Sequence, residues 1–275
     1  MNKNRNFYAQ PSQEEMKEIE SLYKSNQLDL LEPKLRKLIK NYPHASNLFN
    51  IMGISLHKRG LFDEAIFNFK QAINIQPNFD HAHNNLGNVL KHIGKFEEAV
   101  TSFRRAIEIN SNYAEAYSNL GNALTEIGKI EEAIVNHQKA LKLNPNHAVF
   151  YTNLGTSLVE LGKYEEAILN HKRALKLNPK FAEAYSNLGN ALTEIGKIEE
   201  AIVNHQKALK LNPKYKMANL NESIARLTLG EFEIGWKKYE ARIGENNITP
   251  MRHPIEKIWD GNYLNGILLV WAEQG

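Results

Sequence analysis

Three histidines stand at one place in a recurring pattern and are the residues that most readily suggest metal chemistry. His137, His171 and His205 follow one another at intervals of 34 residues. Histidine is a common zinc ligand, but all ligands of one ion must lie within about 2.1 Å of it. Equivalent positions of stacked helical units lie roughly 10 Å apart. Because Phe69 and Phe103 occupy the same place earlier in the chain, we expect buried rings here and no metal site.

Pairs of adjacent glutamates are a second candidate, because general acid–base catalysis often uses carboxylates. Each pair follows a glycine turn and falls in the first turn of an expected helix, where negative charge complements the helix dipole. A catalytic acid needs a cleft that raises its pKa, and a solvated helix start provides none. We therefore predict no catalytic residue among Glu97-Glu98, Glu131-Glu132, Glu165-Glu166 and Glu199-Glu200.

Recurring asparagines suggest binding rather than catalysis. Asparagine is a mediocre helix former, so helix propensity does not explain a row of asparagines on expected helices. A side-chain amide both donates and accepts hydrogen bonds, so such a row can hold an extended peptide backbone with little regard to its sequence. The alternative is that these asparagines only cap or solvate their helices, and the sequence does not decide between the two. The candidate peptide-binding residues are Asn85, Asn88, Asn119, Asn122, Asn153, Asn187, Asn190 and Asn221.

All these residues belong to one repeating unit. The stretch 114–145 returns unchanged at 182–213, and the chain also matches itself at half that spacing. Each unit predicts two helices: Leu120 and Leu124 stand at helical spacing, Gly128 breaks the chain, and Pro145 ends the second helix. Five units follow in succession: 46–79, 80–113, 114–147, 148–181 and 182–215.

The pattern of a large residue, Leu-Gly, two alanines and a closing proline resembles the tetratricopeptide repeat. The resemblance implies an all-α fold, a right-handed superhelical solenoid of helix–turn–helix units. Residues 1–45 then hold a divergent capping repeat, and 216–243 form a divergent last unit, because terminal repeats have only one neighbour. After these we expect a linker at 244–266 and a lone strand at 267–275.

A second resemblance concerns the function. The units resemble the repeats of O-GlcNAc transferases, whose inner-face asparagines hold acceptor polypeptides, and Asn85, Asn119, Asn153 and Asn187 match that ladder. The end of the chain, from GWKKYEARI to ILLVWAEQG, resembles bacterial proteins in which repeats precede a heptosyltransferase-like glycosyltransferase domain. In that resemblance the chain stops inside the first loop of the domain, so we expect no transferase activity from the residues present.

Composition excludes several other classes. The chain has no cysteine, so it has neither disulfides nor thiolate sites, and we expect a cytoplasmic protein. It has no signal-like start and no apolar run long enough to span a membrane. The net charge of +3 comes from interspersed lysines and glutamates, which does not favour nucleic acid.

The predicted function is therefore that of a scaffold, without a cofactor, whose concave, asparagine-lined face binds a protein or an extended peptide. The alternative is the acceptor-recruiting part of a glycosyltransferase that uses a nucleotide sugar. A nucleotide sugar is an expected partner only if the missing domain is present.

Overall fold

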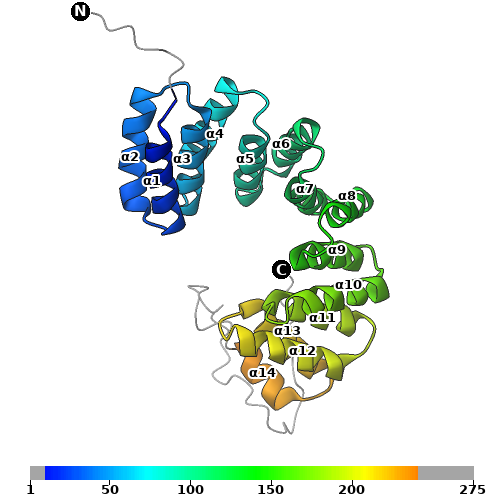
Figure 1. Cartoon of the computed structure of the whole chain (residues 1–275). Coiled ribbons are helices and arrows are strands. Elements are labelled where there is room, and N and C mark those ends of the chain that lie inside the picture. The colour runs from blue at the N-terminus through cyan, green and yellow to red at the C-terminus, as the bar shows by residue number, and fades with distance from the viewer. Residues whose placement is uncertain (1–9, 241–275) are drawn as a thin grey trace, which may run out of the picture. The chain divides into compact units, whose positions relative to one another are not determined.

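Fourteen helices account for the regular structure of residues 10–240, which are the residues that the computed structural model describes (Figure 1). Within this range the chain has no strand, which confirms the predicted all-α class. The predicted linker at 244–266 and strand at 267–275 lie outside the described residues. Across 10–240, no helix is both long and apolar enough to cross a membrane.

The helices come in pairs, and we call the first of each pair an A helix and the second a B helix. The chain divides into an amino-terminal part, 1–157, and a carboxy-terminal part, 158–275. In order the helices are α1 (Gln13–Lys24), α2 (Leu28–Asn41), α3 (Ser46–Lys58), α4 (Phe62–Ile75), α5 (Asp80–His92), α6 (Phe96–Ile109), α7 (Ala114–Glu126), α8 (Ile130–Leu143), α9 (Ala148–Glu160), α10 (Tyr164–Leu177), α11 (Ala182–Glu194), α12 (Ile198–Leu211), α13 (Lys216–Thr228) and α14 (Phe232–Glu240).

The turn between the helices of a pair depends on a glycine. Gly128 has a φ of 74°, in the left-handed region. This conformation lets the Lys129 N–H bond the carbonyl of Leu124 at 2.9 Å, which closes the end of α7. For a residue with a Cβ, adopting it would cost about 1–2 kcal/mol. The repeated glycine therefore sets where each A helix ends and how the chain turns back.

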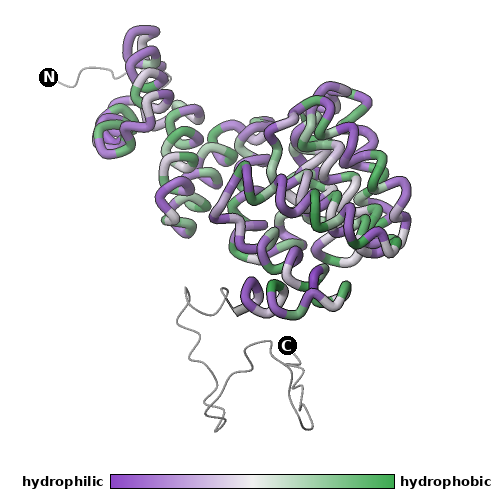
Figure 2. The backbone as a smooth tube through the Cα atoms, turned by 90° about the horizontal axis from the view of Figure 1, so that it is seen from below, coloured by the Kyte–Doolittle hydropathy of each residue, from purple (hydrophilic) through white to green (hydrophobic). Residues whose placement is uncertain are grey.

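In the amino-terminal part, the two helices of a pair pack on each other, and the B helices α2, α4 and α6 pack on the next A helices, α3, α5 and α7. The pairs α3–α4, α5–α6 and α7–α8 pack in this way, and α5 also contacts α3 and α7. Hydrophobic and hydrophilic residues alternate along the helices (Figure 2), as one-sided burial requires. Large buried side chains such as Leu48, Phe69, Phe103 and Leu124 fill the core between them.

The carboxy-terminal part repeats this packing through α11–α12 and α13–α14, with one departure in its last pair. Glu222 occupies the position that Leu188 holds one unit earlier, and it is only 1% exposed. Arg226 Nε and Lys238 Nζ each lie 2.8 Å from its carboxylate. Although burial raises the pKa of Glu222, hydrogen bonds from Lys238 and Arg226 keep it below its ordinary value. An ion-pair cluster thus replaces apolar packing in the divergent last unit.

Candidate functional site

The three recurring histidines are core residues, as expected. His137, His171 and His205 are at most 1% exposed. A Cβ added to Gly121 would lie 2.5 Å from Cε1 of His137, so the imidazole packs directly against the glycine of the A helix. Phe69 has the same relation to Gly53, where the distance would be 2.7 Å. The imidazoles thus take the place of phenylalanine rings, and within residues 10–240 no cluster of side chains suits a metal ion.

Burial also sets the charge of these histidines. It lowers the pKa of each to about 4, because no water reaches the ring to solvate a proton. For His205 the nearby Glu222 opposes this effect without reversing it. Within the described part of the chain, neither ring nitrogen of any of the three has a hydrogen-bond partner. The histidines are therefore neutral at pH 7 and belong to the packing of the units.

The paired glutamates lie in the first turn of B helices, as predicted. Glu131 and Glu132 begin α8, and Glu132 accepts a hydrogen bond from Arg104 of the preceding B helix at 2.7 Å. Glu166, in the first turn of α10, lies 3.5 Å from Lys163, the N-cap residue of the same helix, and both side chains are more than half exposed. Such exposed carboxylates complement the helix dipole and the neighbouring cations.

The predicted asparagines of the amino-terminal part lie on A helices, and three of them bond across to the preceding A helix. In each case the acceptor stands 35 residues earlier in the chain. We call these contacts rung bonds. All three measure 3.0 Å, and they run from Nδ2 of Asn85 to Oδ1 of Asn50, from Nδ2 of Asn119 to Oδ1 of Asn84, and from Nδ2 of Asn153 to Oγ of Ser118.

Rung bonds use only part of the hydrogen-bonding capacity of each amide. An asparagine side chain has two N–H donors and a carbonyl oxygen with two lone pairs. A rung bond occupies one N–H of Asn119, so its second N–H and its oxygen stay available. Asn88 and Asn122 are half-buried and make no side-chain hydrogen bond within residues 10–240. The asparagines therefore join the units and still present unused donors and acceptors.

The remaining candidates lie in the carboxy-terminal part, where Asn221 makes a different contact. Asn187 and Asn190 lie half-buried on α11, and Asn221 lies on α13. Nδ2 of Asn221 donates to Oδ1 of Asn190 at 2.7 Å. The acceptor here stands 31 residues earlier, so the divergent last unit engages an amide equivalent to that of Asn122.

A hollow of about 380 Å³ opens on the A-helix face of the amino-terminal part, and we call it the asparagine pocket. Four of the eight predicted residues line it: Asn88, Asn119, Asn122 and Asn153. Seven further residues that the sequence reasoning missed complete it: Asn84, Tyr113, Glu115, Ser118, His147, Val149 and Phe150.

Two signals in the sequence point to some of the missed residues. Asn84 and Ser118 each come directly before a predicted asparagine, where they accept the rung bonds. Tyr113 and His147 stand at a place where an aromatic ring recurs in every unit. The ring-bearing series is Phe79, Tyr113, His147, Phe181 and Tyr215.

The chemistry of the asparagine pocket suits recognition. Its polar groups are mostly neutral amides and hydroxyls, and its rings include the stacked pair His147–Phe150, whose centroids lie 4.1 Å apart. Burial raises the pKa of Tyr113 to about 12, with further contributions from Glu115 and Asp80. Its phenol is therefore protonated at pH 7. The pocket combines hydrogen-bonding groups with apolar ring surfaces, as binding sites commonly do.

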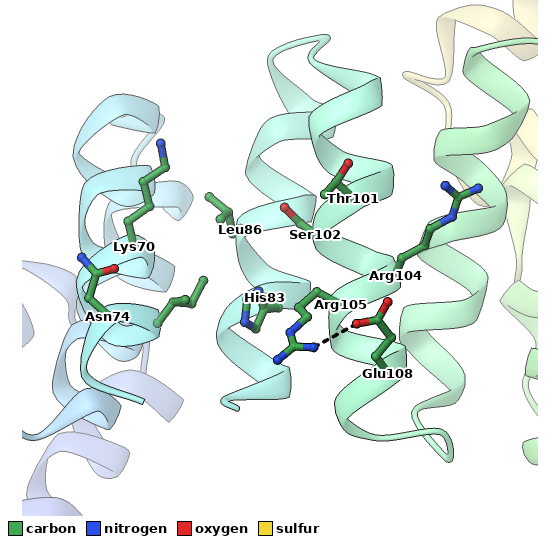
Figure 3. Close-up of a pocket in the computed structure, with 10 residues that line it drawn as sticks. Lys70, Asn74, His83, Leu86, Thr101, Ser102, Arg104, Arg105 and Glu108 are labelled. Carbon is green, nitrogen blue, oxygen red and sulfur yellow. Dashed lines mark hydrogen bonds and ion pairs between the residues drawn. The ribbon is translucent and has the colours of Figure 1, made fainter. Parts of the chain in front are cut away.

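A larger hollow of about 580 Å³ lies on the B-helix side, between α4 and α6 (Figure 3). Its wall carries Arg104 and Arg105, but both already have acidic partners. Arg105 lies 2.9 Å from Glu108, and Arg104 lies 2.7 Å from Glu132. These two arginines are therefore already paired, and none of the predicted asparagines lines this hollow.

Comparison with protein families finds repeat models along most of the described chain. A model described as TPR repeat matches residues 53–94, 91–128 and 155–196. Two models described as tetratricopeptide repeat match 114–147 with 182–215, and 138–169. Together the matches run from 53 to 215. A comparison with curated proteins finds no significant match.

Many solved structures resemble the chain. A crystal structure of MamA is 30% identical, with a TM-score of 0.52, and the match covers 59% of this chain and 95% of that one. TTC0263, a thermophilic TPR protein in Thermus thermophilus, is 23% identical with a TM-score of 0.59; the match covers 66% of this chain and 100% of the other. YrrB, described as a TPR protein with an unusual peptide-binding site, is 21% identical with a TM-score of 0.53, over 67% and 95% of the two chains.

Proposed function

Because the chain belongs to the tetratricopeptide repeat family, we propose that it is a protein-binding scaffold whose A-helix face holds an extended polypeptide. The observation that carries this proposal is the asparagine pocket, where amides with unused bonding capacity gather around a hollow. The peptide-binding site named for YrrB belongs to that protein, and the proposal for this chain rests on its own residues.

Hydrogen-bond matching supports an extended partner. An extended chain presents a backbone N–H and a C=O at each residue, with a rise of about 3.3 Å. In the asparagine pocket, Asn88 and Asn122 offer whole amides, and Asn119 and Asn153 each offer one N–H and an oxygen beyond their rung bonds. Each such bond contributes about 0.5–1.5 kcal/mol. Several such bonds together can hold a peptide backbone with an affinity that depends only weakly on the peptide's side chains.

The test uses variants that leave the rung bonds in place. We expect Asn88→Ala with Asn122→Ala to weaken binding of a labelled nine-residue peptide of serine, threonine and valine by about tenfold, the effect of two lost hydrogen bonds. Fluorescence anisotropy measures the affinity, and circular dichroism checks that helicity is unchanged.

The matched control removes two asparagines on B helices. Asn68 and Asn136 each donate to a carbonyl of their own helix at 2.8 Å and lie outside the asparagine pocket. Asn68→Ala with Asn136→Ala should leave peptide affinity unchanged. The proposal fails if the wild-type chain does not bind the peptide, or if the pocket and control variants bind it equally well.

We keep as the alternative that these repeats recruit acceptor polypeptides for a glycosyltransferase that uses a nucleotide sugar. The stretch at the end of the chain that suggests it begins within α14, at Gly235, and most of its residues lie outside the described range. The two functions share the same binding face. Incubating the chain with the peptide and a radiolabelled nucleotide sugar distinguishes them: transfer of label that a Glu273→Ala change abolishes would establish the transferase.

A further inference from the structure

We propose that the asparagine pocket selects a partner segment with a basic side chain, preferably arginine, whose charged group faces Glu115. This inference rests on the proposed function and adds a specificity to it. The asparagines bind the backbone of the partner, and Glu115 together with the neighbouring rings binds one of its side chains.

The charge of the asparagine pocket is negative. Glu115 is exposed and is the only aspartate, glutamate, lysine or arginine among the described residues that line the pocket. Within residues 10–240 it has no ion-pair partner, whereas Glu132 and Glu108 are paired with arginines. Asp80 adds negative charge near the same wall, since both Asp80 and Glu115 help to raise the pKa of Tyr113. A cation entering the pocket would therefore meet an unmatched carboxylate.

The surfaces around Glu115 suit the rest of a basic side chain. Tyr113 and His147 provide half-buried rings, and Val149 is 41% exposed. Phe150 is buried and stacks on His147. The apolar stems of lysine and arginine pack on such surfaces while the charged head stays near water. A guanidinium group also stacks on rings and can donate to the oxygens of Asn119 or Asn122. These features favour arginine over a neutral side chain of similar size.

A glutamate at this place is a property of particular units. The unit 182–215, which differs from 114–147 only in its last two residues, carries Glu183 at this place. Burial raises the pKa of Tyr215, the last residue of that unit, and Glu183 contributes to the rise. In the units 80–113 and 148–181 the same place holds His81 and Val149. The preference for a basic side chain is thus expected in the two units with a glutamate at this place, 114–147 and 182–215. Glu183 should bind a second basic residue of the partner.

The experiment compares peptides that differ only in the charge at one position. Four labelled nine-residue peptides of serine, threonine and valine carry arginine, lysine, citrulline or glutamate at their centre. Citrulline has nearly the shape of arginine without its charge. At low salt the wild-type chain should bind the arginine peptide about fivefold more tightly than the citrulline peptide. High salt should reduce the difference, because the carboxylate is exposed.

Two variants locate the effect. Glu115→Gln should bring the arginine-to-citrulline ratio close to one, because the glutamine side chain carries no charge to attract the guanidinium group. Glu131→Gln, an exposed change at the start of α8 outside the pocket, should leave the ratio as in the wild type.

The outcomes separate this inference from the proposed function. A wild-type ratio near one, a preference for the glutamate peptide, or a preference that survives Glu115→Gln would overturn the selectivity. If Asn88→Ala with Asn122→Ala still weakens binding of all four peptides, the binding face itself would stand. If none of the four peptides binds the wild-type chain, both proposals fall.

Discussion

The wild-type chain should lose stability on acidification from pH 7 to pH 5. Replacing His137, His171 and His205 by phenylalanine should remove most of this loss. Burial lowers the pKa of each histidine to about 4, from an ordinary value of 6.5. As the pH falls below 6.5, the unfolded chain therefore takes up protons at these positions before the folded chain does. Protonation then favours unfolding, so the contribution of each histidine to stability is present above pH 6.5 and is lost as the pH falls towards 4.

The size of the effect follows from the two pKa values. Between pH 7 and 5, each histidine lowers the free energy of unfolding by about 2 kcal/mol. Phenylalanine does not titrate, and the fold already accepts it at this place, since Phe69 and Phe103 pack against Gly53 and Gly87 as His137 packs against Gly121. The triple variant should therefore match the wild type at pH 7 and exceed it clearly at pH 5.

Urea unfolding at pH 7 and pH 5, followed by far-ultraviolet circular dichroism, measures this difference. His81 supplies the control, because it is exposed and lies 3.1 Å from Asp80 at a helix start. A His81→Gln variant should retain the acid sensitivity of the wild type. If the triple phenylalanine variant loses as much stability between the two pH values as the wild type does, the account of the buried histidines is wrong.

Two further predictions concern packing. Gly121→Ala places a Cβ 2.5 Å from the ring of His137 and should cost about 1–3 kcal/mol; in a His137→Ala background, which removes the ring, the same change should cost little. Equal costs in both backgrounds, measured by urea unfolding, would contradict the close packing. Arg226→Ala should cost about 3 kcal/mol by thermal melting, because it leaves Glu222 buried with less compensation. Glu222→Leu with Arg226→Leu, the residues of the preceding unit, should restore stability, and a melting temperature unaffected by Arg226→Ala would refute this reasoning.

The periodic features of the fold could be predicted because they depend on residue types that recur. Gly128 marks a turn since only glycine adopts its φ of 74° without strain. The identity of His137 as a core ring followed from the phenylalanines at the same place in earlier units. These inferences need only the spacing of residues and the cost of placing a Cβ or a charge.

The site was harder to predict, because it depends on which way side chains point between neighbouring helices. Periodicity identifies Asn119, but it does not show that one N–H of its amide is bonded to Asn84. It also does not show that Tyr113, at the end of one unit, and Glu115, at the start of the next, reach the same hollow as Asn153 of the unit after that. Glu222 was missed because a carboxylate at a core position becomes tolerable only when partners such as Lys238 are known.

The rung bonds have a consequence for how such a gene can change. The unit 114–147 carries a donor for the unit before it, Asn119, and an acceptor for the unit after it, Ser118. An amide and a hydroxyl serve equally as acceptors, so a unit can follow different neighbours without leaving a polar group unmatched. Unequal recombination between the identical copies at 114–145 and 182–213 would therefore delete or add 68 residues and still give matched junctions. We expect natural length variants of this array to differ by whole units.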